Sequence, residues 1–164
     1  MNSKKLFIWG FLFVSVIGSL LHFVYEWSGN NSIVRLFTPW NESTWEHMKL
    51  LFFPMLVLVL FLFFKLPEQS PIPVALSIGT LVGLALIPIL FYTYTGVIGF
   101  SVMAIDIAIF YISVLGVFLT GWFLKDNRKL ANRNGLLLTC LVILAILFFI
   151  FSYYPPEIGL FQEP

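Results

Sequence analysis

The chain has 164 residues, of which 60% are hydrophobic and only 10% are charged. Soluble domains carry about 25% charged and about 45–50% apolar residues, so this composition excludes an ordinary soluble fold. A net charge of +1 without a basic run excludes a nucleic-acid-binding or disordered chain. A single cysteine, Cys140, excludes a disulfide framework. The composition therefore predicts a multi-pass membrane protein whose surroundings are the lipid bilayer.

Five apolar stretches follow one another along the chain, each of the roughly 20 residues that a helix needs to cross a bilayer. The first follows Lys4 and Lys5, but no signal-peptide cleavage pattern follows it, so we expect an uncleaved span. Pro155-Pro156 ends the last one. We predict an all-α bundle of five transmembrane helices, forming one transmembrane domain over residues 1–164. The predicted spans are 6–27, 45–65, 73–95, 99–125 and 135–154.

Basic residues predict how the bundle is oriented, because cytoplasmic loops of membrane proteins are enriched in Lys and Arg. With the N-terminus inside, seven of the nine basic residues fall on the cytoplasmic side. Only Arg35 and Lys49 fall outside. We therefore expect the N-terminus inside and the C-terminus outside. The seven inner residues are Lys4, Lys5, Lys65, Lys125, Arg128, Lys129 and Arg133.

Polar residues gather near the predicted outer face, where both histidines and four of the eight acidic residues fall on three spans. His22 and Glu26 are four residues apart and so share one helix face. Residues 42–47 open the second span, where an α-helical repeat would bring their polar side chains to one face. Asp106 lies about 10 Å below the outer surface in the fourth span. The candidate cluster is His22, Glu26, Glu42, Glu46, His47 and Asp106.

This combination of residues is typical of a divalent metal site. Helical bundles assemble metal centres from carboxylate and imidazole groups on facing helices, and such ligands suit zinc, iron or manganese. A metal in the outer leaflet would activate water towards a lipid or peptide bond. Glu42 or Glu46 would then act as general base, and Ser43 as a proton relay or ligand. The hypothesis is a metal-dependent membrane hydrolase.

The same residues also fit other roles. Ser43-x-x-Glu46 has the pattern of a capping box that starts a helix, and Asp106 has Tyr92, Tyr94 and His47 as alternative partners. The acids would equally serve an ion- or proton-coupled transport or binding component, which would need a homo-oligomer because five spans are few. A third hypothesis is a non-enzymatic accessory protein that docks a membrane partner. No H-E-x-x-H motif decides between them.

Two segments carry a resemblance to a known family. The pattern HFxYEW over residues 22–27 and the pattern NESxWEHxKL over residues 41–50 resemble a family of small uncharacterised bacterial integral membrane proteins. PPxIxLF over residues 155–161 is similar to the ending of that family. The resemblance implies a multi-pass protein of the bacterial cytoplasmic (inner) membrane and no particular reaction. It also implies that the first five residues of the candidate cluster belong together, and that the tail lies on their side as a lid.

Overall fold

A computed structural model describes residues 2–164, with all of their side chains except those of residues 132–134. This described part contains five α-helices, three short 3₁₀-helices and no strand, which confirms the predicted all-α bundle. The side chain of Arg133, one of the basic residues used for orientation, lies outside the described residues. The helices are α1 (Ser3–Trp27), η1 (Val34–Leu36), α2 (Thr44–Lys65), α3 (Ile72–Ile98), α4 (Met103–Leu124), η2 (Arg128–Arg133), α5 (Asn134–Tyr153) and η3 (Gly159–Phe161).

Short-range capping sets where the first helix begins. Asn2 is the N-cap of α1, and its side-chain oxygen accepts a hydrogen bond from the Lys4 amide at 3.0 Å. A cap of this kind satisfies one of the amides that a helix leaves unpaired in its first turn. The helix therefore starts at Ser3, ahead of the apolar run that predicts the span.

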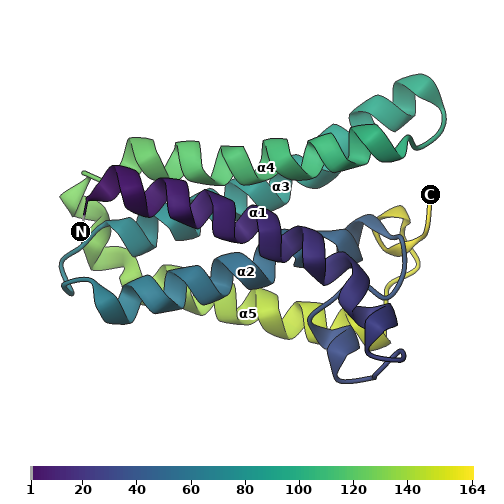
Figure 1. The fold of residues 1–164 in the computed structure, drawn as a ribbon, viewed down its shortest axis with the longest axis horizontal. Helices are drawn as coiled ribbons and strands as arrows, with labels where there is room; N and C mark the ends of the chain where they lie inside the picture. The colour runs from purple at the N-terminus through teal and green to yellow at the C-terminus, as the bar shows by residue number, and fades with distance from the viewer. Residues whose placement is uncertain (1) are drawn as a thin grey trace.

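The five α-helices run up and down in turn, so the two termini lie at opposite ends of the bundle (Figure 1). α1, α3 and α5 finish at one end of the bundle, and α2 and α4 start there. We call it the C-terminal end of the bundle. α2 packs against α1, α3, α5 and η3, whereas the most extensive contact between two helices is that of α3 with α4. The candidate site residues on α1 and α2 thus meet at the C-terminal end.

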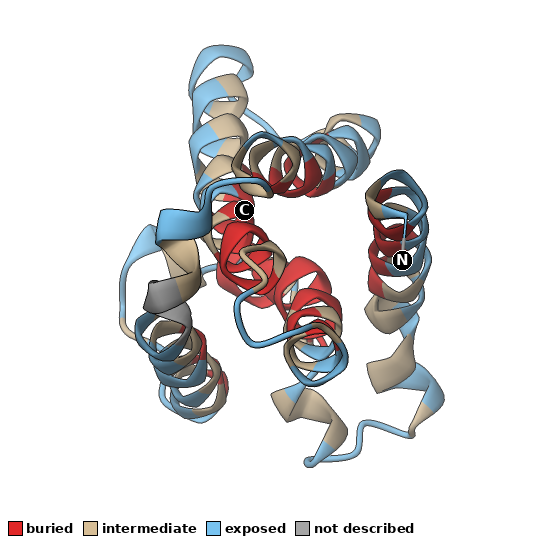
Figure 2. Ribbon diagram, turned by 90° about the vertical axis from the view of Figure 1, so that its left-hand side faces the viewer, coloured by how far each residue is buried: buried red, intermediate tan, exposed pale blue. Residues whose placement is uncertain are grey.

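The core lies around α2. Leu51, Phe52 and Met55 of this helix are fully buried, and buried residues gather on the faces that the helices turn toward one another (Figure 2). The outward faces carry large apolar side chains, with Phe64 and Phe123 each 80% exposed. A soluble monomer rarely exposes extended apolar surface, and all five α-helices are long and apolar enough to cross a membrane. The chain is a multi-pass membrane protein, and a lipid bilayer covers these outward faces.

The close packing of α3 on α4 depends on glycine. A Cβ atom built at Gly79 would lie 2.3 Å from the backbone oxygen of Val117, and one at Gly83 would lie 3.0 Å from the backbone oxygen of Ser113. These glycines are four residues apart, the small-xxx-small spacing that lets two helices in a membrane approach each other closely. The α3–α4 pair is therefore held by backbone proximity as well as by side chains.

Candidate functional site

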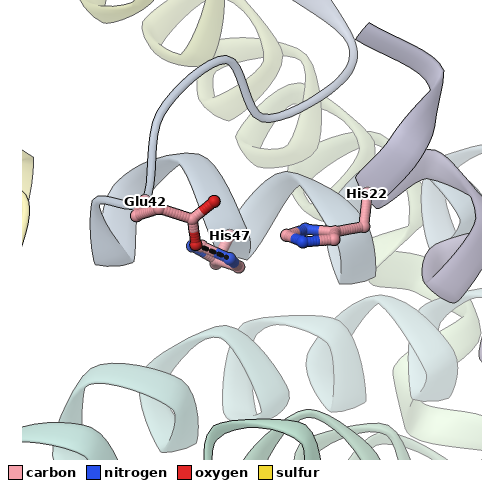
Figure 3. A group of neighbouring side chains, drawn as sticks. All are labelled: His22, Glu42 and His47. Carbon is pink, nitrogen blue, oxygen red and sulfur yellow. Dashed lines mark ion pairs between the residues drawn. The ribbon is translucent and has the colours of Figure 1, made fainter. Parts of the chain in front are cut away.

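His22 of α1, Glu42 of the α1–α2 connection and His47 of α2 meet at the C-terminal end of the bundle (Figure 3). One potential ligand atom from each lies within 4.8 Å of the others. Nε2 of His47 lies 3.4 Å from Oε2 of Glu42, and the two imidazole centroids are 5.4 Å apart. The structure thus brings both histidines of the chain together with one carboxylate.

A close approach of α1 to α2 makes this meeting possible. A Cβ atom at Gly18 would lie only 2.5 Å from the backbone oxygen of Leu50, so a larger residue would force the helices apart. His22 follows Gly18 by four residues and His47 precedes Leu50 by three, about one helical turn in each case. Gly18 therefore sets the separation of the two histidines.

The hydrogen bonding of His47 determines which of its nitrogens faces the cluster. Its Nδ1 lies 3.0 Å from the backbone oxygen of Ser43. A carbonyl oxygen can only accept, so Nδ1 carries a hydrogen and donates it. In the neutral ring Nε2 then has no hydrogen and points its lone pair toward the Glu42 carboxylate, which is also an acceptor. Two acceptors at 3.4 Å have no hydrogen to share, and a cation between them or a second proton on the ring would turn the contact into an attraction.

The start of α2 explains why Glu42 points to this site. Ser43 is the N-cap, and its Oγ accepts from the Glu46 amide at 3.4 Å, while its own amide donates to Oδ1 of Asn41 at 3.1 Å. Only the Ser43 half of the predicted capping box forms, because the Glu46 side chain bonds elsewhere. Glu42 therefore precedes the helix, so the turn at Asn41 directs its side chain and the helical repeat does not.

Glu46 lies apart from the histidines, although it neighbours His47 in the sequence. Successive residues of a helix point about 100° apart, and Glu46 faces the interior, where its Oε2 accepts from Nζ of Lys49 at 2.6 Å. Lys49 is fully buried and Glu46 only 2% exposed. Lys49 also donates to Oγ of Ser152 at 2.6 Å. Lys49 was not among the predicted site residues, although its Glu-x-x-Lys spacing is a sequence signal for this pair.

The remaining candidates lie in two different places. Glu26 is exposed and, together with His22 and Glu42, lines a cavity of about 110 Å³. Asp106 instead accepts a hydrogen bond from the hydroxyl of Tyr94, whose oxygen accepts from the Val102 amide at 3.1 Å. The structure therefore brings His22, Glu42 and His47 together and places Glu26 on the cavity that His22 and Glu42 line. It gives Asp106 a bond across the α3–α4 turn.

The C-terminal tail packs beside the site rather than over the cavity. The ring of Phe161 lies 4.9 Å from that of Trp45 and 5.2 Å from that of Phe151, measured between centroids. Within the described residues, the side chains that line the cavity all belong to positions from His22 to Glu42. The contacts of the tail are thus with α2 and α5 on the side of Trp45.

The comparison with family models decides where this chain belongs. The model of a family of unknown function, DUF6512, matches residues 1–164. The chain belongs to this family. Membership in DUF6512 confirms the predicted resemblance to an uncharacterised family, and it assigns no reaction. No curated protein and no solved structure matches the chain.

What this DUF6512 protein can do chemically therefore has to be argued from its geometry. Zinc bonds of about 2.0–2.1 Å at tetrahedral angles place two ligand atoms about 3.3–3.4 Å apart. The separation of 3.4 Å between Nε2 of His47 and Oε2 of Glu42 already matches this spacing. The hydrogen bond from Nδ1 of His47 to a backbone carbonyl is also the usual support of a metal-bound histidine. The ligand atom of His22 lies within 4.8 Å of these two atoms.

Proposed function

We propose that His22, Glu42 and His47 bind one divalent metal ion and that the protein is a metal-dependent membrane hydrolase. The observation that carries the proposal is the orientation of His47, whose Nδ1 is committed to the Ser43 carbonyl while Nε2 faces Glu42 at 3.4 Å. A metal ion between these two atoms removes the repulsion of two acceptors and adds two bonds. Zinc, iron and manganese all accept two imidazoles and a carboxylate.

Three protein ligands leave a coordination position open, which is the pattern of catalytic rather than structural zinc. A bound metal lowers the pKa of a coordinated water and so supplies a hydroxide nucleophile near neutral pH. Glu26 is the carboxylate that lines the same cavity outside the ligand group, so we assign it the role of general base. By this proposal the site faces the outer side of the membrane, in keeping with the basic residues.

The metal part of the proposal is tested by elemental mass spectrometry on protein purified without chelators. We expect stoichiometric metal in the wild-type protein and its loss in a His22→Ala, His47→Ala double variant. Asp106→Asn is the matched control, because that acid is bonded to Tyr94. Wild-type protein that stays free of metal after incubation with Zn²⁺, Fe²⁺ and Mn²⁺ would refute the metal site. A protonated His47 bonded to Glu42 would then explain their contact at 3.4 Å.

The hydrolase part needs a separate measurement. Metal-loaded protein in vesicles is incubated with ester lipids or with a membrane-anchored peptide, and products are identified by mass spectrometry. We expect Glu26→Gln to retain its metal and to lose hydrolysis. A wild-type protein that binds metal and cleaves neither substrate would contradict hydrolysis and favour the ion-coupled transport component.

A further inference from the structure

The connection between α1 and α2, residues 28–43, carries Glu42 and much of the cavity wall, although surface loops are usually the mobile parts of a protein. Lys49 lies one turn into α2, and its side chain contacts this loop. Its Nζ donates to the backbone oxygen of Arg35 at 2.9 Å and lies 3.4 Å from that of Thr38. Because Lys49 is fully buried, water does not compete for these bonds.

Glu46 holds the same loop closer to the site. Its Oε2 accepts from the backbone amide of Trp40 at 3.4 Å, in addition to the bond from Lys49. Trp40 is two residues from Glu42 and lines the cavity with it. The buried pair therefore binds two carbonyls and one amide in the short segment that leads into the Glu42 carboxylate.

The end of α5 completes the arrangement. Arg35 donates from its guanidinium to the backbone oxygen of Ser152 at 2.6 Å and stacks over the Trp40 ring at 3.7 Å. The hydroxyl of Tyr153 donates to the backbone oxygen of Ser32 at 2.8 Å. The loop is thus held between α2 on one side and α5 on the other.

A Ser–Lys catalytic pair is the competing role for these side chains, since Oγ of Ser152 lies 2.6 Å from Nζ of Lys49. A general base must accept the proton of the serine hydroxyl, whereas Nζ of Lys49 donates to Oγ of Ser152, and that hydroxyl donates to the backbone oxygen of Phe148 at 2.7 Å. Both Ser152 and Lys49 are fully buried, so no substrate reaches them. The geometry therefore does not support catalysis at this pair.

We propose instead that Lys49 and Glu46 are positioning residues, which set the path of the loop so that Glu42 meets His47. The inference rests on the proposed metal site for its functional consequence, and on the hydrogen bonds alone for the placement of the loop. Replacing a buried ion pair by apolar residues of similar size is often neutral for stability, but such residues would not hold the two carbonyls and the amide. The charged pair thus orients Glu42 through the loop, as the Ser43 carbonyl orients His47 through its Nδ1.

The test is a Lys49→Met, Glu46→Leu double variant, which removes both charges and keeps the volume. Changes to the residues that orient metal ligands typically weaken metal binding about 10–100-fold, and we expect a loss of this size in Zn²⁺ affinity measured by titration calorimetry. Melting should stay close to wild type, and amide hydrogen exchange should become faster in residues 29–43. Lys65→Met, on the exposed end of the same helix, is the matched control and should change none of these quantities.

Each outcome separates the two proposals. A folded double variant with wild-type Zn²⁺ affinity and wild-type exchange in the loop overturns the positioning role. Wild-type protein that binds no metal overturns the proposed function alone. Faster loop exchange in the double variant, with a changed ¹⁵N shift of His47 Nε2, would still establish that the pair positions Glu42. Unchanged exchange and an unchanged shift in that case overturn both.

Discussion

Replacing Lys49 by methionine removes one member of a buried ion pair and leaves the other without its strongest partner. Glu46 would keep only the Trp40 amide and Oγ of Ser152, both at 3.4 Å, in place of an ammonium at 2.6 Å. Removing one member of a buried pair costs about 3–5 kcal/mol, because an uncompensated charge stays behind. A protein of this size loses about 2–4 °C in Tm per kcal/mol, so we expect Tm to fall by about 6–20 °C.

Two further variants separate the cost of an unpaired buried charge from the cost of lost hydrogen bonds. Glu46→Gln should cost less, because Lys49 keeps the carbonyls of Arg35 and Thr38 and the Ser152 hydroxyl as acceptors. The double variant Lys49→Met, Glu46→Leu should recover most of the loss, since no charge remains buried. Melting is followed in one detergent at a fixed scan rate, because unfolding of membrane proteins is often irreversible. A double variant that melts as low as Lys49→Met would refute the reasoning and show that the hydrogen bonds lost from the loop carry the cost.

Three other predictions concern the site and its orientation. Gly18→Ala should move α1 away from α2 by about 1 Å, because its Cβ would lie 2.5 Å from the Leu50 backbone oxygen and ordinary contact needs about 3.5 Å. This movement should weaken Zn²⁺ binding. Gly96→Ala is the control and should leave the binding unchanged, because a Cβ there would have nothing within 4 Å. Removing residues 158–164 should lower Tm through the lost ring contact with Trp45 and leave Zn²⁺ affinity unchanged; a weaker affinity would show that the tail is a lid. A periplasmic reporter fused after Pro164 should be active, and a silent one would reverse the proposed orientation.

The fold could be predicted because a bilayer leaves few choices. Every backbone group inside the hydrocarbon must be bonded within its own segment, so five apolar runs of the right length become five helices. The meeting of His22 with His47 was also predictable, because consecutive spans cross the membrane in opposite directions and the end of the first lies on the same side as the start of the second. The importance of Gly18 could not be predicted, because a small residue in an apolar run has many possible neighbours and only the fold places it against the backbone of Leu50.

The direction of each acid at the start of α2 could not be predicted in the same way. Both Asn41 and Ser43 are good N-caps, and a helix that began at the first would have turned Glu42 and Glu46 along one face. The chain uses Ser43, so Glu42 stays outside the helix and Glu46 enters its first turn. A shift of two residues thus decides which acid meets His47. Likewise, Lys49 has its partners in Arg35 and Ser152, which only the folded chain brings together.

Neighbouring residues of α2 therefore have different roles, in the packing of the bundle or in the candidate site. Glu46 and Lys49 point into the bundle and hold it together, whereas His47 points toward α1 with its side chain 30% exposed and the Glu42 side chain beside it 66% exposed. Substitution of a half-exposed side chain away from the core usually changes stability by less than about 0.5 kcal/mol. A bound metal itself raises Tm, so the reference is metal-free wild-type protein. Histidine variants that bind no metal and melt with this reference would report on ligation itself, because the residues that hold the fold lie on the other side of the same helical turn.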